Sequence, residues 1–362
     1  MLALAKELDS LGKAETYSLR TARIIGTGSF VPPYEVDNKM ISSMYTSRDP
    51  GWIESRTGIH ARRHGFNYET MTMRDGYYDN DIAEKAAKSA LDNAGITAKE
   101  LDMIIRVTCT PEYLFFPDAG CVMHERLEAS NDCAALTIPA GCGGLVYALK
   151  VVEGMIKGGS VNKVLIVASN SVSSYIDFDQ KERDSLNAYI FGDGAGAVVM
   201  QGEDSSNGKL NTPGIIASYW GADRYRDPML YPAGGSRNPT RISNVEDHWY
   251  KMDAKAVRVE APKLMLRAIG GLQKACPFLL HEVDWFLFHQ ANLRILEDLS
   301  KKAEIPMEKI LINLDKYGNT SAASIAILLD EAVREGKIKR GDLLLLSAVG
   351  AGWQYGSFLI RW

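Results

Sequence analysis

Hydrophobic and polar positions follow the same order in two regions of the chain that begin about 180 residues apart. Residues 86–108 and 264–290 each show apolar residues at helical spacing, then a short linker, then an aspartate before a continuous apolar run of strand length. Such uninterrupted runs are typical of strands buried on both faces, as in parallel sheets covered by helices. Each region therefore predicts a helix followed by a central strand.

A second pair of segments extends the repeat. Residues 139–167 and 317–346 each open with a glycine-containing turn, continue as a strongly apolar helix that ends near a glycine, and finish in an apolar strand. Because two consecutive units agree in order and spacing, we interpret the chain as two duplicated α/β halves, 21–205 and 206–362, preceded by an N-terminal extension, 1–20. Chance similarity between ordinary helix–strand units is the alternative.

Length and composition agree with a globular protein that buries a sizeable core. The chain has 362 residues, of which 46% are hydrophobic and 24% charged, so two domains or one large fused unit are expected. The net charge of −4 does not favour nucleic acid or an anionic membrane as a partner. An acidic partner would need a local basic patch on this chain.

The sequence also bears on compartment and metal binding. No apolar stretch reaches the length of a membrane span, and the first residues lack the basic and then apolar pattern of a secretion signal. The five cysteines are odd in number and show no C-x-x-C spacing, which is typical of a reducing cytoplasm. No cluster of histidine, cysteine and carboxylate has metal-ligand spacing. We therefore expect a cytoplasmic protein without a metal.

Cys142 is the candidate nucleophile. It precedes a helix that is predicted to begin near Gly143 and to be buried, because its residues are apolar nearly all round. A helix N-terminus carries about half a positive charge, which would lower the pKa of the thiol and favour the thiolate. The neighbouring glycines leave room for a substrate carbonyl. A small buried cysteine packed among glycines is the alternative, and we interpret the remaining four cysteines as structural.

Six further segments agree in order and spacing with one known family. They are I-G-T-G-S-F-V-P-P (25–33), W-I-E-S-R-T-G-I-H-A-R-R (52–63), F-G-D-G-A-G-A-V-V (191–199), F-H-Q-A-N-L-R (288–294), Y-G-N-T-S-A-A-S (317–324) and G-A-G-W-Q-Y-G (350–356). Together they resemble β-ketoacyl-acyl-carrier-protein synthase III and its relatives in the thiolase superfamily, from about residue 23 to residue 362. The resemblance implies a thiolase-like α/β fold whose two halves form five layers, α-β-α-β-α.

The family's Cys–His–Asn set falls on Cys142, His289 and Asn319. His289 follows the apolar run 285–288, at the edge where α/β sheets present their sites. Asn319 stands at the opening of the second-half helix, in the position equivalent to Cys142; a simple helix N-cap is its alternative role. The two halves would then bring two helix N-termini to a shared centre.

The resemblance implies a reaction in two stages. Cys142 takes the acyl group of an acyl thioester, and the backbone N–H groups of Cys142 and Ala351 hold the oxyanion. A malonyl thioester then loses CO₂ while His289 and Asn319 donate hydrogen bonds to its thioester oxygen. The carbanion attacks the acyl group and releases a β-ketoacyl thioester. Coenzyme A thioesters are substrates in this scheme, and no cofactor is implied.

The resemblance also implies a coenzyme A site and a homodimer. Trp52 would stack on the adenine, with Arg56 near the nucleotide and Arg183 as the candidate for a second stacking residue. Asn292 is a further expected substrate-binding residue. Phe116 would reach across the homodimer interface into the acyl pocket of the neighbouring subunit. Ordinary core packing is the alternative for Trp52 and Phe116.

An acyl carrier protein is the expected macromolecular partner. Because that protein is acidic, as this chain is overall, docking requires a local cationic surface. Arg294, Lys301 and Lys302 match family positions on the helix after His289, and their spacing can place them on one face. A plain solvated basic face is the alternative.

Departures from the family pattern leave the pathway open. P-A-G-C-G-G-L stands where a run of the A-A-C-S/A-G-F type is usual, extra residues precede Trp52, and Ala351 interrupts the last glycine run. We therefore weigh fatty-acid initiation against a specialised fatty-acid or polyketide pathway.

Acyl transfer to oxygen, nitrogen or water without decarboxylation is a rival activity. The chain could also be a non-catalytic subunit of a heterodimeric synthase, but the complete Cys–His–Asn set argues against that role.

Overall fold

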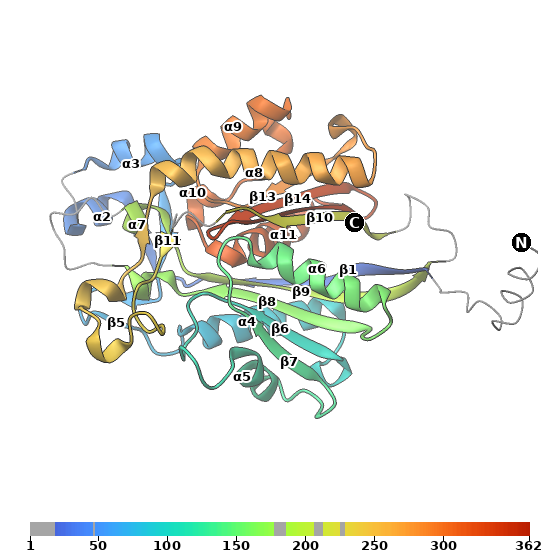
Figure 1. Ribbon diagram of the computed structural model, residues 1–362, viewed down its shortest axis with the longest axis horizontal. Coiled ribbons are helices and arrows are strands. Elements are labelled where there is room, and N and C mark those ends of the chain that lie inside the picture. The colour runs from blue at the N-terminus through green and yellow to red at the C-terminus, as the bar shows by residue number, and fades with distance from the viewer. Residues whose placement is uncertain (1–18, 46–47, 177–185, 206–212, 225–228) are drawn as a thin grey trace, which may run out of the picture.

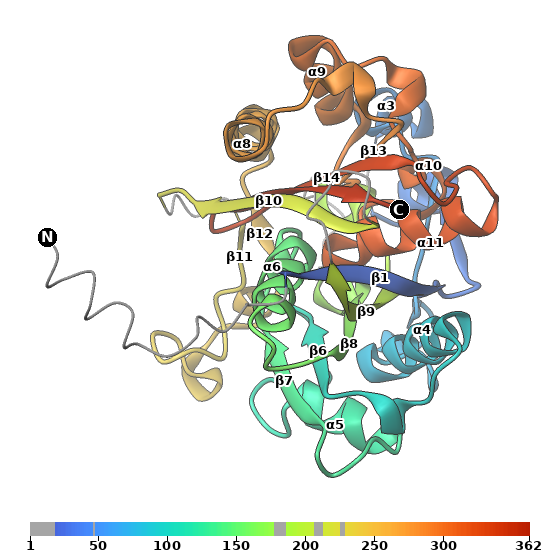
Figure 2. The same ribbon diagram turned by 90° about the vertical axis from the view of Figure 1, so that its right-hand side faces the viewer.

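Two β-sheets lie face to face, with helices between them and on both outer sides (Figure 1, Figure 2). The structure is a computed structural model that describes residues 19–45, 48–176, 186–205, 213–224 and 229–362. In spatial order, the five-stranded sheet consists of β1 (Leu19–Phe30), β9 (Gly194–Ser205), β8 (Lys163–Asn170), β6 (Met103–Val107) and β7 (Ala134–Ile138). The four-stranded sheet consists of β10 (Gly214–Ala222), β15 (Gln354–Arg361), β14 (Leu343–Gly350) and β13 (Trp285–Phe288).

Both sheets are mixed. Strand β6 is parallel to β7 and β8, whereas β9 is antiparallel to β8 and β1. In the second sheet β13 is parallel to β14, and β15 is antiparallel to β14 and β10. Nearly every residue of the central strands β8 and β14 is buried. Their long apolar runs, 164–168 and 343–346, follow from this position, because helices cover both faces of each sheet.

Six helices make up the remaining three layers. One outer layer consists of α4 (Asp79–Ala94) and α5 (Ala119–Arg126), and the opposite one of α8 (Ala254–Ala275) and α9 (Leu293–Ala303). The middle layer consists of α6 (Gly144–Lys157) and α11 (Ser324–Arg334), which contact strands of both sheets. The order of the layers is therefore α-β-α-β-α, as the sequence predicts, and Figure 2 shows the stack from its side.

The predicted helix–strand units are all present. Helix α4 leads to β6 as α8 leads to β13, and α6 leads to β8 as α11 leads to β14. Strand β1 begins at Leu19, two residues before the predicted start of the first half, and β9 ends at Ser205. The division into halves at residues 205 and 206 stays a prediction, since the two middle helices pack into one shared core.

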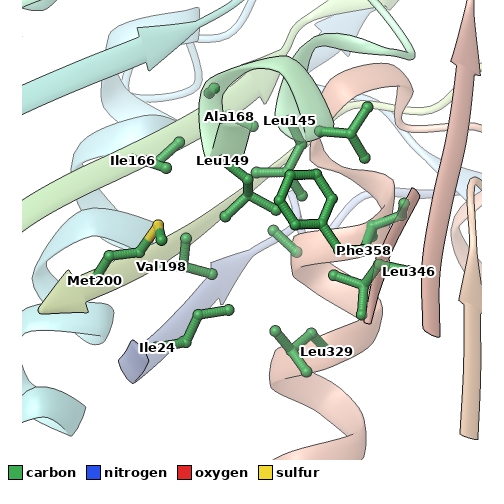
Figure 3. Close-up of a cluster of buried hydrophobic side chains, with 14 of the residues drawn as sticks. Ile24, Leu145, Leu149, Ile166, Ala168, Val198, Met200, Leu329, Leu346 and Phe358 are labelled. Carbon is green, nitrogen blue, oxygen red and sulfur yellow. The ribbon is translucent and has the colours of Figure 1, made fainter. Parts of the chain in front are cut away.

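The shared core lies between the sheets (Figure 3). Leu145 and Leu149 of α6 point toward Phe358 and Leu346 of the four-stranded sheet, and each of these side chains is at most 2% exposed. Burying an aliphatic or aromatic side chain of this size contributes about 1.5–3 kcal/mol. Helix α6 is apolar nearly all round because it faces a sheet on both sides. This burial fixes the position of its N-terminus.

Shorter elements complete the fold, and those labelled α2, α3, α7, β5 and β11 lie on the left in Figure 1. They are β2 (Glu35–Asp37), α2 (Asn38–Tyr45), α3 (Pro50–Thr57), β3 (Ala61–Arg63), β4 (Phe66–Asn67), β5 (Thr72–Met73), α7 (Leu186–Ile190), β11 (Met229–Leu230), β12 (Lys251–Met252) and α10 (Leu314–Tyr317). Across the described ranges, no helix combines the length and the apolar character that crossing a membrane would need.

Candidate active site

Cys142 lies in the turn between β7 and α6, directly before the first turn of that buried helix. The turn is closed by a 2.7 Å hydrogen bond from the N–H of Gly144 to the carbonyl oxygen of Gly141. The sulfur of Cys142 lies 3.6 Å from the hydroxyl oxygen of Ser321, which comes from the segment that leads into α11. The starts of the two middle helices therefore meet at the candidate nucleophile.

The acidity of the Cys142 thiol differs from the sequence-based expectation. Burial raises the pKa of Cys142 to about 11, although hydrogen bonds from Ser321 and Asn319 act in the opposite direction. Removing the sulfur from water disfavours the thiolate, and this effect outweighs the expected gain from the helix N-terminus. The expectation of a lowered pKa is therefore wrong, and the free enzyme holds a protonated thiol at neutral pH.

Asn319 is fixed in the turn before α11. Its backbone N–H donates to the carbonyl oxygen of Ile190 (2.8 Å), and its carbonyl oxygen accepts from the N–H of Gly192 (3.1 Å). The side-chain oxygen accepts a 2.8 Å hydrogen bond from the N–H of Ser321. This bond orients the carboxamide and leaves its NH₂ group for the sulfur of Cys142. The side chain thus caps a turn and also presents a donor.

His289 follows β13 and is 2% exposed. Its backbone N–H donates to the carbonyl oxygen of Ser347 (2.9 Å), and its Nδ1 lies 2.7 Å from the hydroxyl oxygen of Ser324. Burial lowers the pKa of His289 to about 4, so the ring is neutral at physiological pH. Within the part of the chain that the structure describes, Nε2 is buried and has no hydrogen-bond partner.

Two serines that the sequence patterns did not single out support this site. Ser321 contacts the sulfur of Cys142, and its φ of 53° is in a region that residues with side chains rarely adopt. Ser324 orients the ring of His289. Both belong to the Y-G-N-T-S-A-A-S segment, but their roles depend on partners that only folding brings near.

Two cavities have a member of the candidate triad in their walls, Asn319 in the larger and Cys142 in the smaller, whereas His289 lines neither. The larger, about 460 Å³, has Trp52, Arg56, Asn292, Arg294 and Asn319 among its lining residues. The smaller, about 170 Å³, is lined by Cys109, Gly141, Cys142, Val172, Phe191, Met229, Leu230, Tyr231, Tyr250, Ser321 and Ala351. Neighbouring residues Ile190 and Phe191 line one cavity each, so the two cavities lie close to one another.

Trp52 lies on α3 at the wall of the larger cavity. Asp49 caps this helix by accepting from the N–H groups of Gly51 and Trp52. The ring of Trp52 packs edge-on against Tyr189, with centroids 6.2 Å apart, and the guanidinium of Arg56 lies 5.9 Å from its centroid. The aromatic ring and a cation therefore occupy the same cavity wall, and their role in binding a nucleotide stays a prediction.

Asn292 caps α9, where its side-chain oxygen accepts from the N–H of Arg294 (2.8 Å). The guanidinium of Arg294 bonds to the carbonyl oxygen of Ser55 and to both carboxylate oxygens of Glu297. The positive charge of Arg294 is therefore partly neutralised by the carboxylate of Glu297. Lys301 and Lys302 are exposed in the last turn of the same helix.

The remaining predicted residues lie in different places. Ala351 lines the smaller cavity together with Cys142. The loop of Ala351 packs tightly against the turn that contains Cys142, because a side chain at Gly350 would place its first carbon 2.4 Å from the backbone nitrogen of Gly143. Phe116 is 88% exposed and lines neither cavity. Arg183 lies outside the described residues. Among the residues that the structure describes, no cluster of three His, Cys, Asp or Glu side chains could hold a metal ion.

Comparison with known proteins gives consistent likenesses. Residues 136–223 match the family described as 3-oxoacyl-[acyl-carrier-protein] synthase III, and residues 274–362 match its C-terminal part. A β-ketoacyl-[acyl-carrier-protein] synthase III from Caldanaerobacter subterraneus subsp. tengcongensis is 38% identical over 344 residues, which covers 94% of this chain and 98% of that protein.

Solved structures agree with these sequence matches. The 3-oxoacyl-[acyl-carrier-protein] synthase III of Aquifex aeolicus is 33% identical, has a TM-score of 0.79, and covers 94% of this chain and 100% of its own. A priming β-ketosynthase from a polyketide biosynthetic pathway is 25% identical, has a TM-score of 0.78, and covers 95% and 97% of the two chains.

The fold and these likenesses first define a class: the protein is an acyltransferase of the ketosynthase type with the thiolase fold. Within that class, the chain belongs to the 3-oxoacyl-[acyl-carrier-protein] synthase III family. The family that the motifs indicate is thereby confirmed.

Proposed function

We propose that the protein joins a Cys142-bound acyl group to the carbanion of a decarboxylated malonyl thioester, with His289 and Asn319 as the stabilising donors. This proposal rests on the Nε2 atom of His289, which is buried and has no hydrogen-bond partner among the described residues. A buried polar atom without a partner costs about 1–3 kcal/mol, which is tolerated where a substrate supplies the partner. The thioester oxygen of the malonyl group is such an acceptor.

The neutral ring of His289 suits both stages of the reaction. The hydroxyl of Ser324 can accept from a protonated Nδ1 or donate to an unprotonated one, so it supports either tautomer. In the first stage Nε2 takes the proton of the Cys142 thiol, whose raised pKa requires a base, and gives it to the thiolate that leaves as the acyl group moves to Cys142. In the second stage a protonated Nε2 donates to the enolate oxygen, beside the NH₂ group of Asn319.

The oxyanion of the first stage would be held by backbone N–H groups. Cys142 and Ala351 line the same cavity, and the close approach of the Gly350 and Gly143 backbones keeps their two loops together. Backbone donors held in fixed loops need no reorganisation as charge develops. Losing one such donor typically costs about 100-fold or more in rate.

The larger cavity suits the nucleotide part of coenzyme A, with Trp52 stacking on adenine and Arg56 near the phosphates. Replacing Trp52 by alanine should raise KM for an acyl-coenzyme A by about tenfold or more, because stacking of a base on an aromatic ring is lost. KM for the acyl thioester of N-acetylcysteamine, which has no nucleotide, should stay within about twofold. Steady-state kinetics with both substrates measure the two values. An equal loss with both substrates would assign Trp52 to packing instead.

Two macromolecular partners are part of the proposal. Exposed Lys301 and Lys302, with the partly compensated Arg294, offer a cationic surface beside the larger cavity for an acidic acyl carrier protein.

Large apolar side chains that are 49–88% exposed follow one another in residues 113–116 and end at Phe116. Exposed apolar patches of this kind mark contact surfaces, which supports a homodimer.

Two pathways remain as candidates for this reaction. Relatives named β-ketoacyl-[acyl-carrier-protein] synthase III favour the initiation of fatty-acid synthesis. The likeness to a priming β-ketosynthase favours the start of a polyketide chain as the second candidate. Both are served by the same decarboxylative condensation, so the pathway is decided by the acyl group and the carrier, not by the triad.

Release of CO₂ tests the proposed function. With a short acyl-coenzyme A and malonyl thioesters of coenzyme A or acyl carrier protein, the protein should form one β-ketoacyl thioester for each CO₂ released. Labelled CO₂ and mass spectrometry of the thioester measure both products. Acyl transfer to water or to an added amine without CO₂ would instead support a non-decarboxylating acyltransferase.

A further inference from the structure

A second thiol, that of Cys109, lies in the same cavity as the thiol of Cys142. Strands β6 and β7 are parallel neighbours with Val107 opposite Ile138, and the two cysteines follow these strand ends by two and four residues. Neighbouring strands are about 4.8 Å apart, so the two segments start within the Cα separation of about 4.4–6.8 Å that a disulfide needs. Both cysteines are half-buried, so neither is sealed away from the cavity.

The hydroxyl of Ser321 links the two sulfurs. Its oxygen lies 3.6 Å from the sulfur of Cys142, and it also hydrogen-bonds the thiol of Cys109. A side chain added at Gly141, the residue before Cys142, would place its first carbon 3.5 Å from the sulfur of Cys109 and 3.4 Å from the oxygen of Ser321. The backbone at the candidate nucleophile is therefore in contact range of the second sulfur, with one shared hydroxyl beside both.

The sulfur of Cys109 is held in this position by further donors. The side-chain amide of Asn170 donates to it at 3.1 Å, and the phenol hydroxyl of Tyr250 lies 3.5 Å away. Burial raises the pKa of Cys109 above its usual value, although the hydrogen bonds act in the opposite direction. Cys109 is therefore a neutral thiol with a defined place beside Cys142, and the condensation has no step that uses it.

We infer that Cys109 is a resolving thiol: when a peroxide oxidises Cys142, the two sulfurs join in a reversible disulfide that stops acylation. The inference rests on the proposed function, because it takes Cys142 as the acylated residue and His289 as its base. A cysteine that a thioester can reach is also within reach of the much smaller peroxide. Without a resolving thiol, a sulfenic acid is oxidised further to a sulfinic acid, which thiols do not reduce.

The oxidation balances in two steps. Nε2 of His289 takes the proton of the Cys142 thiol, and the thiolate attacks one oxygen of hydrogen peroxide. The O–O bond breaks, a sulfenic acid forms on Cys142, and the leaving hydroxide takes the proton from His289 to become water. The sulfur of Cys109 then attacks the sulfenic sulfur, and the hydroxide that leaves takes the proton of the Cys109 thiol. Two thiols and one peroxide thus give one disulfide and two waters, and an added dithiol reverses the change.

The test treats the reduced protein with hydrogen peroxide and then measures intact mass, disulfide-linked peptides and acyl adduct formation. Wild-type protein should lose about two mass units, yield a peptide pair linked through Cys109 and Cys142, and form the adduct at least about tenfold more slowly. Dithiothreitol should restore most of the adduct formation. In Cys109→Ser the same treatment should add about 32 mass units on Cys142, and dithiothreitol should restore at least about tenfold less.

A matched control removes a different thiol. Cys121 is exposed on α5 and lines neither cavity, so Cys121→Ala should show the same loss of mass and the same recovery as wild-type protein. Diamide, which oxidises dithiols without adding oxygen, gives a reading that needs no variant. It should produce the linked pair of Cys109 and Cys142 in wild-type protein.

The outcomes separate the inference from the proposed function. Reduced protein that forms the adduct but yields no linked pair with peroxide or diamide overturns the inference alone. Equal recovery of wild-type protein and Cys109→Ser does the same, because a resolving thiol would then protect nothing. Absence of the adduct in reduced protein overturns the proposed function and with it the loss of acylation that the inference includes.

Discussion

Replacing Cys142 by alanine abolishes the acyl adduct and reduces condensation by about 10⁴-fold or more, the loss seen when a catalytic nucleophile is removed. The side chain lost is the only part of the residue that can form the thioester, while the backbone N–H that we propose for the oxyanion site remains. Alanine is compatible with the turn before α6, because the neighbouring N–H and C=O groups keep their hydrogen bond. Intact-protein mass after incubation with an acyl-coenzyme A, and CO₂ release in the full reaction, measure the two effects.

Two further cysteine variants serve as controls. Cys121 is exposed and lies on α5, away from both cavities, so Cys121→Ala should form the adduct at the wild-type rate. Cys109→Ser tests the second thiol of the smaller cavity and should still become acylated on Cys142. A labelled adduct that survives in Cys142→Ala and disappears in Cys109→Ser would transfer the nucleophile role to Cys109.

Replacing Asn319 by aspartate lowers condensation at neutral or mildly alkaline pH by about 10²–10³-fold, the typical cost of removing one donor from an oxyanion site. The two side chains have nearly the same shape, but an ionised carboxylate accepts hydrogen bonds and donates none. It would also repel the negative charge that develops on the thioester oxygen. Formation of the Cys142 adduct should fall less than condensation does, because the donor role of Asn319 belongs to the second stage.

The pH profile makes this prediction specific. A buried carboxyl has a raised pKa, so the introduced group should take up a proton as the pH falls and become a donor again. Activity of Asn319→Asp should therefore rise toward acidic pH. Wild-type activity should not rise in this way, and it should decline as His289, with a pKa of about 4, becomes protonated and loses its neutral form. A variant with wild-type activity at pH 8, or with no acidic recovery, would remove Asn319 from the donor role.

Much of the fold could be predicted from local patterns. The helix–strand units around residues 86–108 and 264–290 correspond to α4 with β6 and α8 with β13. Buried runs such as 285–288 appear as strands because a central strand shields both faces from water and needs apolar residues throughout. The motifs likewise indicated the family, since they preserve the residues at the helix starts and strand ends.

Further features depend on partners that are distant in the chain. Ser321 and Cys142 are 179 positions apart, and Tyr250 and Cys109 are 141 positions apart, so no periodicity predicts either contact. The hydrogen bonds from the guanidinium of Arg294 to the carbonyl oxygen of Ser55, 239 positions away, are likewise beyond the reach of periodicity. Short-range patterns report which face of an element is buried, but not which side chain lies opposite.

The sequence by itself determined the layered α/β fold, the family and the three residues of the candidate triad, because periodicity, glycine turns and motif order are properties of neighbouring residues. Only the tertiary structure decided the protonation of the site. A helix N-terminus alone favours a thiolate, but burial of the sulfur in the folded protein raises the pKa of Cys142, and burial of its ring keeps His289 neutral. Only the tertiary structure, too, brought Tyr231 and Tyr250 together in the wall of the smaller cavity, since β11 and β12 pair across a long connecting loop.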